Sequence, residues 1–181
     1  VYKRQVKDKH LLNIDVSYNI APSHHVLTLT SEPTLMRWSY NPTWAKAPMN
    51  LINARSETLN VKPSFKMAKR CLIVADGWYE WLRTDNKKQP YFFHMNDSLF
   101  NFAGIYTEYN GEMGCAIITK DAIQKLSTVH HRMPIIIADD EADSWLSGED
   151  VFDSKSSENI EFYPVSTCLL YTSPSPRDRY I

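Results

Sequence analysis

Cys71-Leu72-Ile73-Val74-Ala75 is a short apolar run suited to a central β-strand, and Trp78-Tyr79-Glu80-Trp81-Leu82 continues as a second extended segment. The polar turn Asp85-Asn86-Lys87-Lys88 then separates this segment from Tyr91-Phe92-Phe93-His94-Met95. Short apolar and aromatic runs that alternate with polar turns are typical of neighbouring antiparallel strands. This part of the sequence therefore predicts a β-meander.

The strand pattern extends in both directions from this region. Residues 26–30 alternate between apolar and polar side chains, and residues 100–106 and 115–119 give two further strands. Asn110-Gly111 lies between the last two and is a strong hairpin signal, because both residues tolerate a positive φ. Helices do not alternate regularly with these strands, which argues against a doubly wound parallel sheet. We expect an α+β fold: a strand-rich single domain with a curved antiparallel sheet or partial barrel and flanking short helices.

Few helices are expected, and all of them are short. Residues 63–70 begin with Pro63, which suits the first turn of a helix. Residues 121–127 place their apolar side chains on one side. Residues 140–146 begin with acidic side chains, which the helix dipole favours, and Gly148 is positioned to end that helix.

The composition limits the class of protein. A chain of 181 residues suits one domain, and 20 basic against 21 acidic residues give a formal net charge of -1. This balance excludes a protein that coats nucleic acid through overall charge, although it permits a local basic groove. The three cysteines, Cys71, Cys115 and Cys168, are too widely spaced for a disulfide framework or a metal-binding pair, which favours a reducing compartment. No apolar run approaches the ~20 residues that span a bilayer, so we expect no membrane association.

The two ends of the chain differ from its middle. Residues 1–5 show no periodic pattern, and residues 168–181 include a run of Ser, Pro and Arg that is unsuited to a packed core. We expect the domain to cover residues 6–167. The two end segments are expected to be either foreign to the natural protein or disordered, and the natural N-terminus is expected to lie upstream.

One polar cluster follows the apolar pair Leu51-Ile52. Asn53, Arg55 and Glu57 occupy alternate positions, so in an extended segment their side chains would point to the same side. An amide beside a guanidinium offers hydrogen-bond donors to an oxyanion or a phosphate. The alternative is the exposed polar face of an ordinary strand.

Two further clusters carry groups suited to acid–base chemistry. Glu80 lies among aromatic residues, where loss of solvent raises the pKa of a carboxyl group, although a solvent-facing side chain between core aromatics is the alternative. His130 belongs to Val129-His130-His131-Arg132-Met133-Pro134, and imidazole is the usual proton carrier near neutral pH. A structural histidine is the alternative there. Adjacent histidines in extended chain point to opposite faces, so no metal site is expected. The sequence contains no Gly-rich phosphate loop, and no cofactor is expected.

Taken together and in order, these clusters resemble the SOS-response-associated peptidase family, whose members process abasic sites in DNA. The elements that carry the resemblance span about residues 17–146 and are Tyr18-Asn19-Ile20-Ala21-Pro22, Arg37-Trp38, Pro42 with Trp44, Asn53-Ala54-Arg55-Ser56-Glu57-Thr58, Phe65-Lys66, Asp76-Gly77-Trp78-Tyr79-Glu80-Trp81, Phe102-Ala103-Gly104, Ile117-Ile118-Thr119 and His130-His131-Arg132-Met133-Pro134.

The resemblance implies a reaction and a partner. In that family, a cysteine exposed by removal of the initiator Met condenses with the aldehyde of an abasic sugar in single-stranded DNA. The product is a thiazolidine that crosslinks protein and DNA. The expected partner is therefore single-stranded DNA with abasic sites. The protein is expected to be a monomer in the cytoplasm, near the nucleoid in a bacterium, or in the nucleus of a eukaryote.

The resemblance also assigns roles to residues. It implies that Asn53, Glu80 and His130 are catalytic: Asn53 holds the reacting end, while Glu80 and His130 transfer protons. The residues implied to bind DNA are Arg55, Arg132, Trp38, Trp44 and Trp81. The Met-Cys-Gly start of the family is absent from this chain, whose first cysteine is Cys71. We therefore expect the chain as printed to be inactive in crosslinking.

Two other functions are compatible with the same residues. The first is a single-stranded DNA-binding module without chemistry, in which the tryptophans stack on bases. The second is a peptidase that acts beyond its own N-terminus. The lack of another plausible nucleophile in the sequence weighs against this second alternative.

Overall fold

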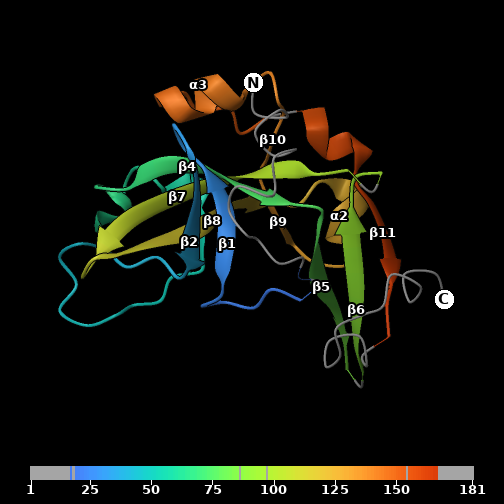
Figure 1. Cartoon of the computed structure of the whole chain (residues 1–181). Coiled ribbons are helices and arrows are strands. Elements are labelled where there is room, and N and C mark those ends of the chain that lie inside the picture. The colour runs from blue at the N-terminus through green and yellow to red at the C-terminus, as the bar shows by residue number, and fades with distance from the viewer. Residues whose placement is uncertain (1–16, 18, 86, 97, 154, 167–181) are drawn as a thin grey trace.

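The computed structural model describes residues 17, 19–85, 87–96, 98–153 and 155–166 (Figure 1). The predicted end segments, 1–5 and 168–181, lie outside the described residues, as does Cys168. The strands are β1 (His25–Leu29), β2 (Pro33–Trp38), β3 (Asn53–Arg55), β4 (Lys69–Ala75), β5 (Gly77–Thr84), β6 (Lys87–His94), β7 (Phe100–Tyr109), β8 (Glu112–Asp121), β9 (Arg132–Pro134), β10 (Ile136–Ile137) and β11 (Glu161–Pro164). The helices are α2 (Gln124–Ser127) and α3 (Ala142–Ser147), with 3₁₀ turns η2 (Ser56–Thr58), η3 (Pro63–Phe65) and η4 (Lys155–Asn159).

The main sheet contains eight strands and curves strongly. Its pairings lead from β1 through β2, β8, β7 and β4 back to β1, and the joins β1–β4 and β2–β8 each have only two residue pairs. The predicted strand-rich α+β domain with a curved sheet is thus confirmed. The sheet is mixed rather than antiparallel, because β2 and β3 both run parallel to β8. Long connections, not hairpins, link these strands to β8, and such connections permit parallel pairing.

The segment that follows His130 fills the gap where β7 and β8 diverge. β9 pairs with the last residues of β8, while β10 pairs with the first residues of β7. Between them, the backbone nitrogen of Ile135 donates to Ile118 (2.9 Å), and its carbonyl accepts from Ala103 (2.8 Å). The main sheet therefore fixes the position of the chain immediately after His130.

A second, antiparallel sheet has the order β11–β6–β5. Its β5–β6 hairpin extends away from the main sheet toward the bottom of the view in Figure 1. A hydrophobic cluster joins the two sheets. Trp78 of β5 stacks on Phe93 of β6 (5.0 Å between ring centroids), and Phe93 stacks on Phe162 of β11 (5.0 Å).

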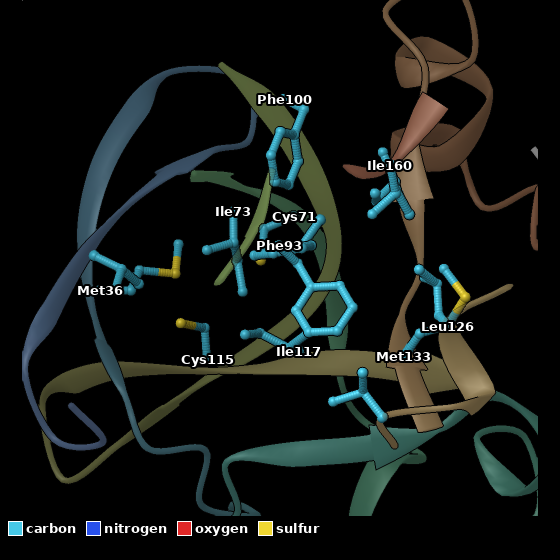
Figure 2. Close-up of a cluster of buried hydrophobic side chains, with 14 residues drawn as sticks. Met36, Cys71, Ile73, Phe93, Phe100, Cys115, Ile117, Leu126, Met133 and Ile160 are labelled. Atoms are coloured by element: carbon cyan, nitrogen blue, oxygen red, sulfur yellow. The ribbon is translucent and has the colours of Figure 1, made fainter. Parts of the chain in front are cut away.

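The same cluster includes residues of the main sheet. Figure 2 shows Met36, Cys115 and Ile117 of β2 and β8 on one side of Phe93, while Leu126 of α2, Met133 of β9 and Ile160 lie on its other side. The opposite face of the main sheet carries a second cluster, in which Trp145 of α3 is fully buried. Alternate residues of β4 contribute to the two clusters, which explains why that strand is apolar on both faces from Cys71 to Ala75.

The predicted strands and the Asn110-Gly111 hairpin are confirmed, since these two residues have φ of 53° and 82° between β7 and β8. The helix expected over 63–70 is wrong: only η3 forms, and β4 begins at Lys69. The last two residues of that segment, Lys69 and Arg70, pair with β7 instead of continuing a helix. The last expected helix is confirmed as α3, and it ends at Gly148, whose φ is 111°.

Candidate active site

A cleft of about 1150 Å³ lies where the main sheet faces strand β5. Within the described residues β5 is an edge strand, and the cleft wraps around that edge, because side chains from both of its faces line it. Asn53, Glu80 and His130 all line this cleft, although they lie on different elements and are separated by up to 77 positions in the sequence (130 − 53). The structure therefore places in one cleft the three residues to which the family resemblance assigned catalytic roles.

Strand β3 positions the amide and the guanidinium. Asn53 and Arg55 are exposed and line the cleft, while Ala54 between them is buried. The carbonyl of Ile52 accepts hydrogen bonds from Ile117 N (3.0 Å) and from Trp38 Nε1 (2.9 Å), which fixes the start of the strand. The predicted alternation therefore holds at positions 53 and 55, whereas the 3₁₀ turn η2 carries position 57 away from the strand.

Strand β5 directs Glu80 toward the main sheet. Trp78, two residues earlier, shares its side of the strand and stacks within the core cluster, so Glu80 points the same way. Its side chain is 24% exposed. Burial raises the pKa of this carboxyl above its usual value, and the charge of His130 opposes the rise in pKa. The carboxyl group is therefore suited to exchanging protons closer to neutral pH than an ordinary glutamate.

His130 lies between α2 and β9, directly beside Glu80. Its Nδ1 atom is 3.7 Å from Glu80 Oε2 and 3.0 Å from the carbonyl oxygen of Arg132. The backbone N–H of Arg132 donates to the same Nδ1 atom (3.3 Å). Nδ1 therefore meets both a donor and an acceptor of the Arg132 backbone, which orients the ring, and Nε2 donates or accepts a proton according to the tautomer.

Arg132 is held by an ion-pair network that the sequence did not predict. Its guanidinium donates to both carboxylate oxygens of Glu57 (2.7 and 2.9 Å), to Asp121 Oδ1 (2.6 Å) and to the carbonyl of Thr119 (2.7 Å). This bidentate pairing lowers the pKa of Glu57 to about 2 and raises that of Arg132. In this structure Arg132 therefore ties η2 to β8 and β9, and a DNA phosphate would have to compete with two carboxylates for it.

The predicted tryptophans lie in different environments. Trp38 and Trp81 line the cleft and are half-buried. Trp44 does not line the cleft; it is 57% exposed, and its Nε1 donates to the Pro63 carbonyl at 3.3 Å. Of the three predicted tryptophans, two therefore line the cleft, and Trp44 lies outside its lining.

Neither described cysteine is suited to nucleophilic attack. Cys71 and Cys115 are both fully buried, and burial raises the pKa of each thiol, for Cys115 to about 12. Because the thiolate is the reactive form, these two residues are structural. In the described part of the chain, no three His, Cys, Asp or Glu side chains are grouped as a metal site. None of the described helices is long and apolar enough to cross a membrane.

Comparison with known proteins identifies the family. The model of the SOS response associated peptidase (SRAP) family matches residues 2–170, and the chain belongs to this family. The abasic site processing protein YoqW of Bacillus subtilis is 36% identical over an alignment of 179 positions, which covers 84% of this chain and 80% of that protein. The abasic site processing protein HMCES of Gallus gallus is 34% identical, and the match covers 73% of this chain and 52% of that protein.

Solved structures show the same fold. A crystal structure of a protein from Bacteroides thetaiotaomicron superimposes with a TM-score of 0.72 at 28% identity, covering 85% of this chain and 79% of that chain. A protein from Bordetella bronchiseptica gives a TM-score of 0.74 at 20% identity, covering 90% of this chain and 95% of the other. The second likeness concerns the fold alone.

Proposed function

We propose that this protein processes abasic sites in single-stranded DNA by forming a covalent thiazolidine crosslink through an N-terminal cysteine. The observation that carries the proposal is the pairing of Glu80 and His130 (3.7 Å) in a cleft that also contains Asn53. Relatives that carry the name abasic site processing protein support the substrate. Removal of the initiator Met, by the protein itself, would expose the cysteine.

The chemistry requires two bond-forming steps and no redox change. A neutral α-amine, with a pKa of about 7.7–8.0, adds to the aldehyde of the ring-opened sugar, and loss of water gives a Schiff base. The vicinal thiol then adds to the imine carbon, its proton goes to the nitrogen, and a thiazolidine closes. Ring opening, addition and loss of water each need a proton moved at the sugar.

The cleft offers groups suited to these proton transfers. We assign Glu80 to the exchange of protons with the amine and the departing water, because its carboxyl group lines the cleft beside His130 and burial raises its pKa above the usual value. His130 acts through Nε2 at the sugar hydroxyl, while its Nδ1 is held by the backbone carbonyl and N–H of Arg132. Asn53 donates and accepts hydrogen bonds at the reacting end. Arg55 offers a phosphate contact, since no described carboxylate forms an ion pair with it.

The tryptophans and Arg132 complete the proposed DNA contacts. Trp38 and Trp81 are assigned to stacking on bases beside the abasic site. Arg132 is assigned primarily to holding the backbone that carries His130, with a phosphate contact only where DNA displaces a carboxylate. Trp44 contacts DNA only if the strand passes over the surface outside the cleft.

The test uses the protein expressed from its complete reading frame, incubated with abasic and intact single strands of the same sequence. We expect a denaturation-resistant crosslink with the abasic strand only. Glu80→Gln and His130→Ala should each slow crosslinking about 100-fold while changing equilibrium binding less than about threefold. A protein that begins at Val1 should bind but not crosslink.

The matched control is Glu108→Gln, which removes an exposed carboxylate of β7 that does not line the cleft. This variant should crosslink at the wild-type rate. Equal binding of both strands without any crosslink would instead identify a binding module without chemistry. Equal loss of binding and crosslinking in the Glu80 and His130 variants would contradict their assignment to proton transfer.

A further inference from the structure

The outer half of the β5–β6 hairpin carries two opposed cations. Arg83 and Lys88 are directly paired in the register of the two strands, so their side chains lie on the same face. Both are exposed. Like charges directly opposite each other destabilise an antiparallel pair, so the pairing of Arg83 with Lys88 does not itself stabilise the hairpin.

No described carboxylate compensates these charges. Ion pairs among the described residues involve His25, Arg37, Arg70, His130 and Arg132, but neither Arg83 nor Lys88. The two cations therefore remain available to an anionic partner.

The face that carries the cations leads into the cleft. Trp81 precedes Arg83 by two residues, so it shares the face at a spacing of about 7 Å along the strand. Lys88 Nζ lies 5.2 Å from the centroid of the Trp81 ring, within the range of a cation–π contact. Trp81 lines the cleft and follows Glu80 directly in sequence. An aromatic platform followed by unpaired cations is the arrangement with which proteins bind unpaired nucleic acid strands.

We propose that Arg83 and Lys88, with Trp81 between them and the cleft, form a second DNA contact, here named the hairpin track. The track binds phosphates of the single strand where that strand leaves the cleft. This inference rests on the proposed function, because it takes the strand in the cleft to be DNA. It assigns a phosphate-binding role to two residues outside the cleft lining.

The test measures equilibrium binding to a fluorescent single strand that contains a tetrahydrofuran abasic analogue, which has no aldehyde and forms no crosslink. The variant is Arg83→Ala/Lys88→Ala. Each phosphate contact on a single strand contributes about 0.7 to the slope of log K against log salt concentration. Loss of two contacts should lower the slope by about 1.4. If the two proteins bind equally at 1 M salt, the double variant should therefore bind about 25-fold more weakly than wild type at 0.1 M salt.

Lys87 provides a matched control on the same hairpin. It is exposed and pairs with Thr84, so it belongs to the opposite face. Lys87→Ala should weaken binding less than about twofold. Strands shortened on the 5′ or the 3′ side of the analogue identify the direction of the track, because one of them should bind wild type and the double variant equally.

The outcomes separate this inference from the function on which it rests. Wild-type affinity and salt slope in the double variant, or an equal loss in Lys87→Ala, overturn the hairpin track while leaving the proposed function intact. Failure of the wild-type protein to bind any single strand overturns both. Circular dichroism and the unfolding midpoint of the double variant should match wild type, since the replaced side chains are exposed.

Discussion

The ion pair between Glu57 and Arg132 predicts a pH-dependent contribution to stability. Glu57→Gln keeps the size and polarity of the side chain but removes its charge. The pKa of Glu57 falls from 4.5 to about 2 in the folded protein. At about 1.36 kcal/mol per pKa unit this corresponds to roughly 3.4 kcal/mol. The Glu57 side chain is 47% exposed, however, and solvent screening reduces the figure to about 1–2 kcal/mol at pH 7.

The sign and the pH range follow from the lowered pKa. A carboxyl group whose pKa is depressed on folding stabilises the protein above its unfolded pKa, and this stabilisation is lost as pH falls toward the folded pKa. The contribution of Glu57 is therefore complete above about pH 5 and is lost mainly between 4.5 and 2. At pH 3 less than about half should remain.

Urea denaturation of wild type and Glu57→Gln at pH 7, 5 and 3 measures this contribution. The variant should be less stable by about 1–2 kcal/mol at pH 7 and pH 5, which corresponds to about 2–8 °C in the unfolding midpoint for a chain of this length. The difference should shrink by more than half at pH 3. A difference of the same size at all three pH values would show that the charge of Glu57 is not its source. A difference near zero at pH 7 would refute a stabilising role for the Glu57–Arg132 ion pair.

Three further outcomes concern packing. Gly114→Ala should destabilise the protein by about 3 kcal/mol in urea denaturation, because a Cβ at Gly114 would collide with the Ser39 carbonyl oxygen. Gly111→Ala should cost only about 1 kcal/mol, because Gly111 has open space around it but a φ of 82°. Equal losses in the two variants would contradict this reasoning. Trp145→Phe should cost about 1–3 kcal/mol, because it removes the 2.9 Å hydrogen bond to the buried Cys71 carbonyl, and a loss below 0.5 kcal/mol would contradict that estimate. The Cys71 thiol should resist a thiol reagent in the native protein and react at the rate of unfolding, and rapid native labelling would contradict its burial.

Strands were more predictable from the sequence than helices. The runs at 71–75 and 115–119 are long enough and apolar enough to identify their strands, and both lie in the main sheet. The helix expected at 63–70 did not form beyond η3, since pairing with β7 determines the backbone at Lys69 and Arg70. Parallel pairing of β2 and β3 to β8 leaves no local signal, because the partners are far apart in sequence.

In the site, too, residues were predictable from their neighbours in sequence, whereas contacts between distant residues were not. Glu80 and His130 were identified by polar residues in apolar surroundings, and the fold places their side chains 3.7 Å apart. The partners of Arg132 were not foreseen. Glu57 was recognised as part of a polar cluster with Asn53 and Arg55, but its bond to a residue 75 positions away depends on how β8, β9 and η2 meet. Residue types indicate the chemistry of such a pair, whereas tertiary structure decides which carboxylate meets which cation.

The Glu80–His130 pair, to which we assign proton transfer, is held by two separate anchors. Glu80 is positioned by the stacked rings of Trp78 and Phe93, which attach the small sheet to the core. His130 is positioned through the backbone of Arg132, which the ion pairs with Glu57 and Asp121 hold to the main sheet. Loosening either anchor changes the Glu80–His130 separation without removing a reacting group. Variants at the two anchors should therefore slow crosslinking in proportion to the freedom they introduce, while Glu80→Gln and His130→Ala slow it about 100-fold.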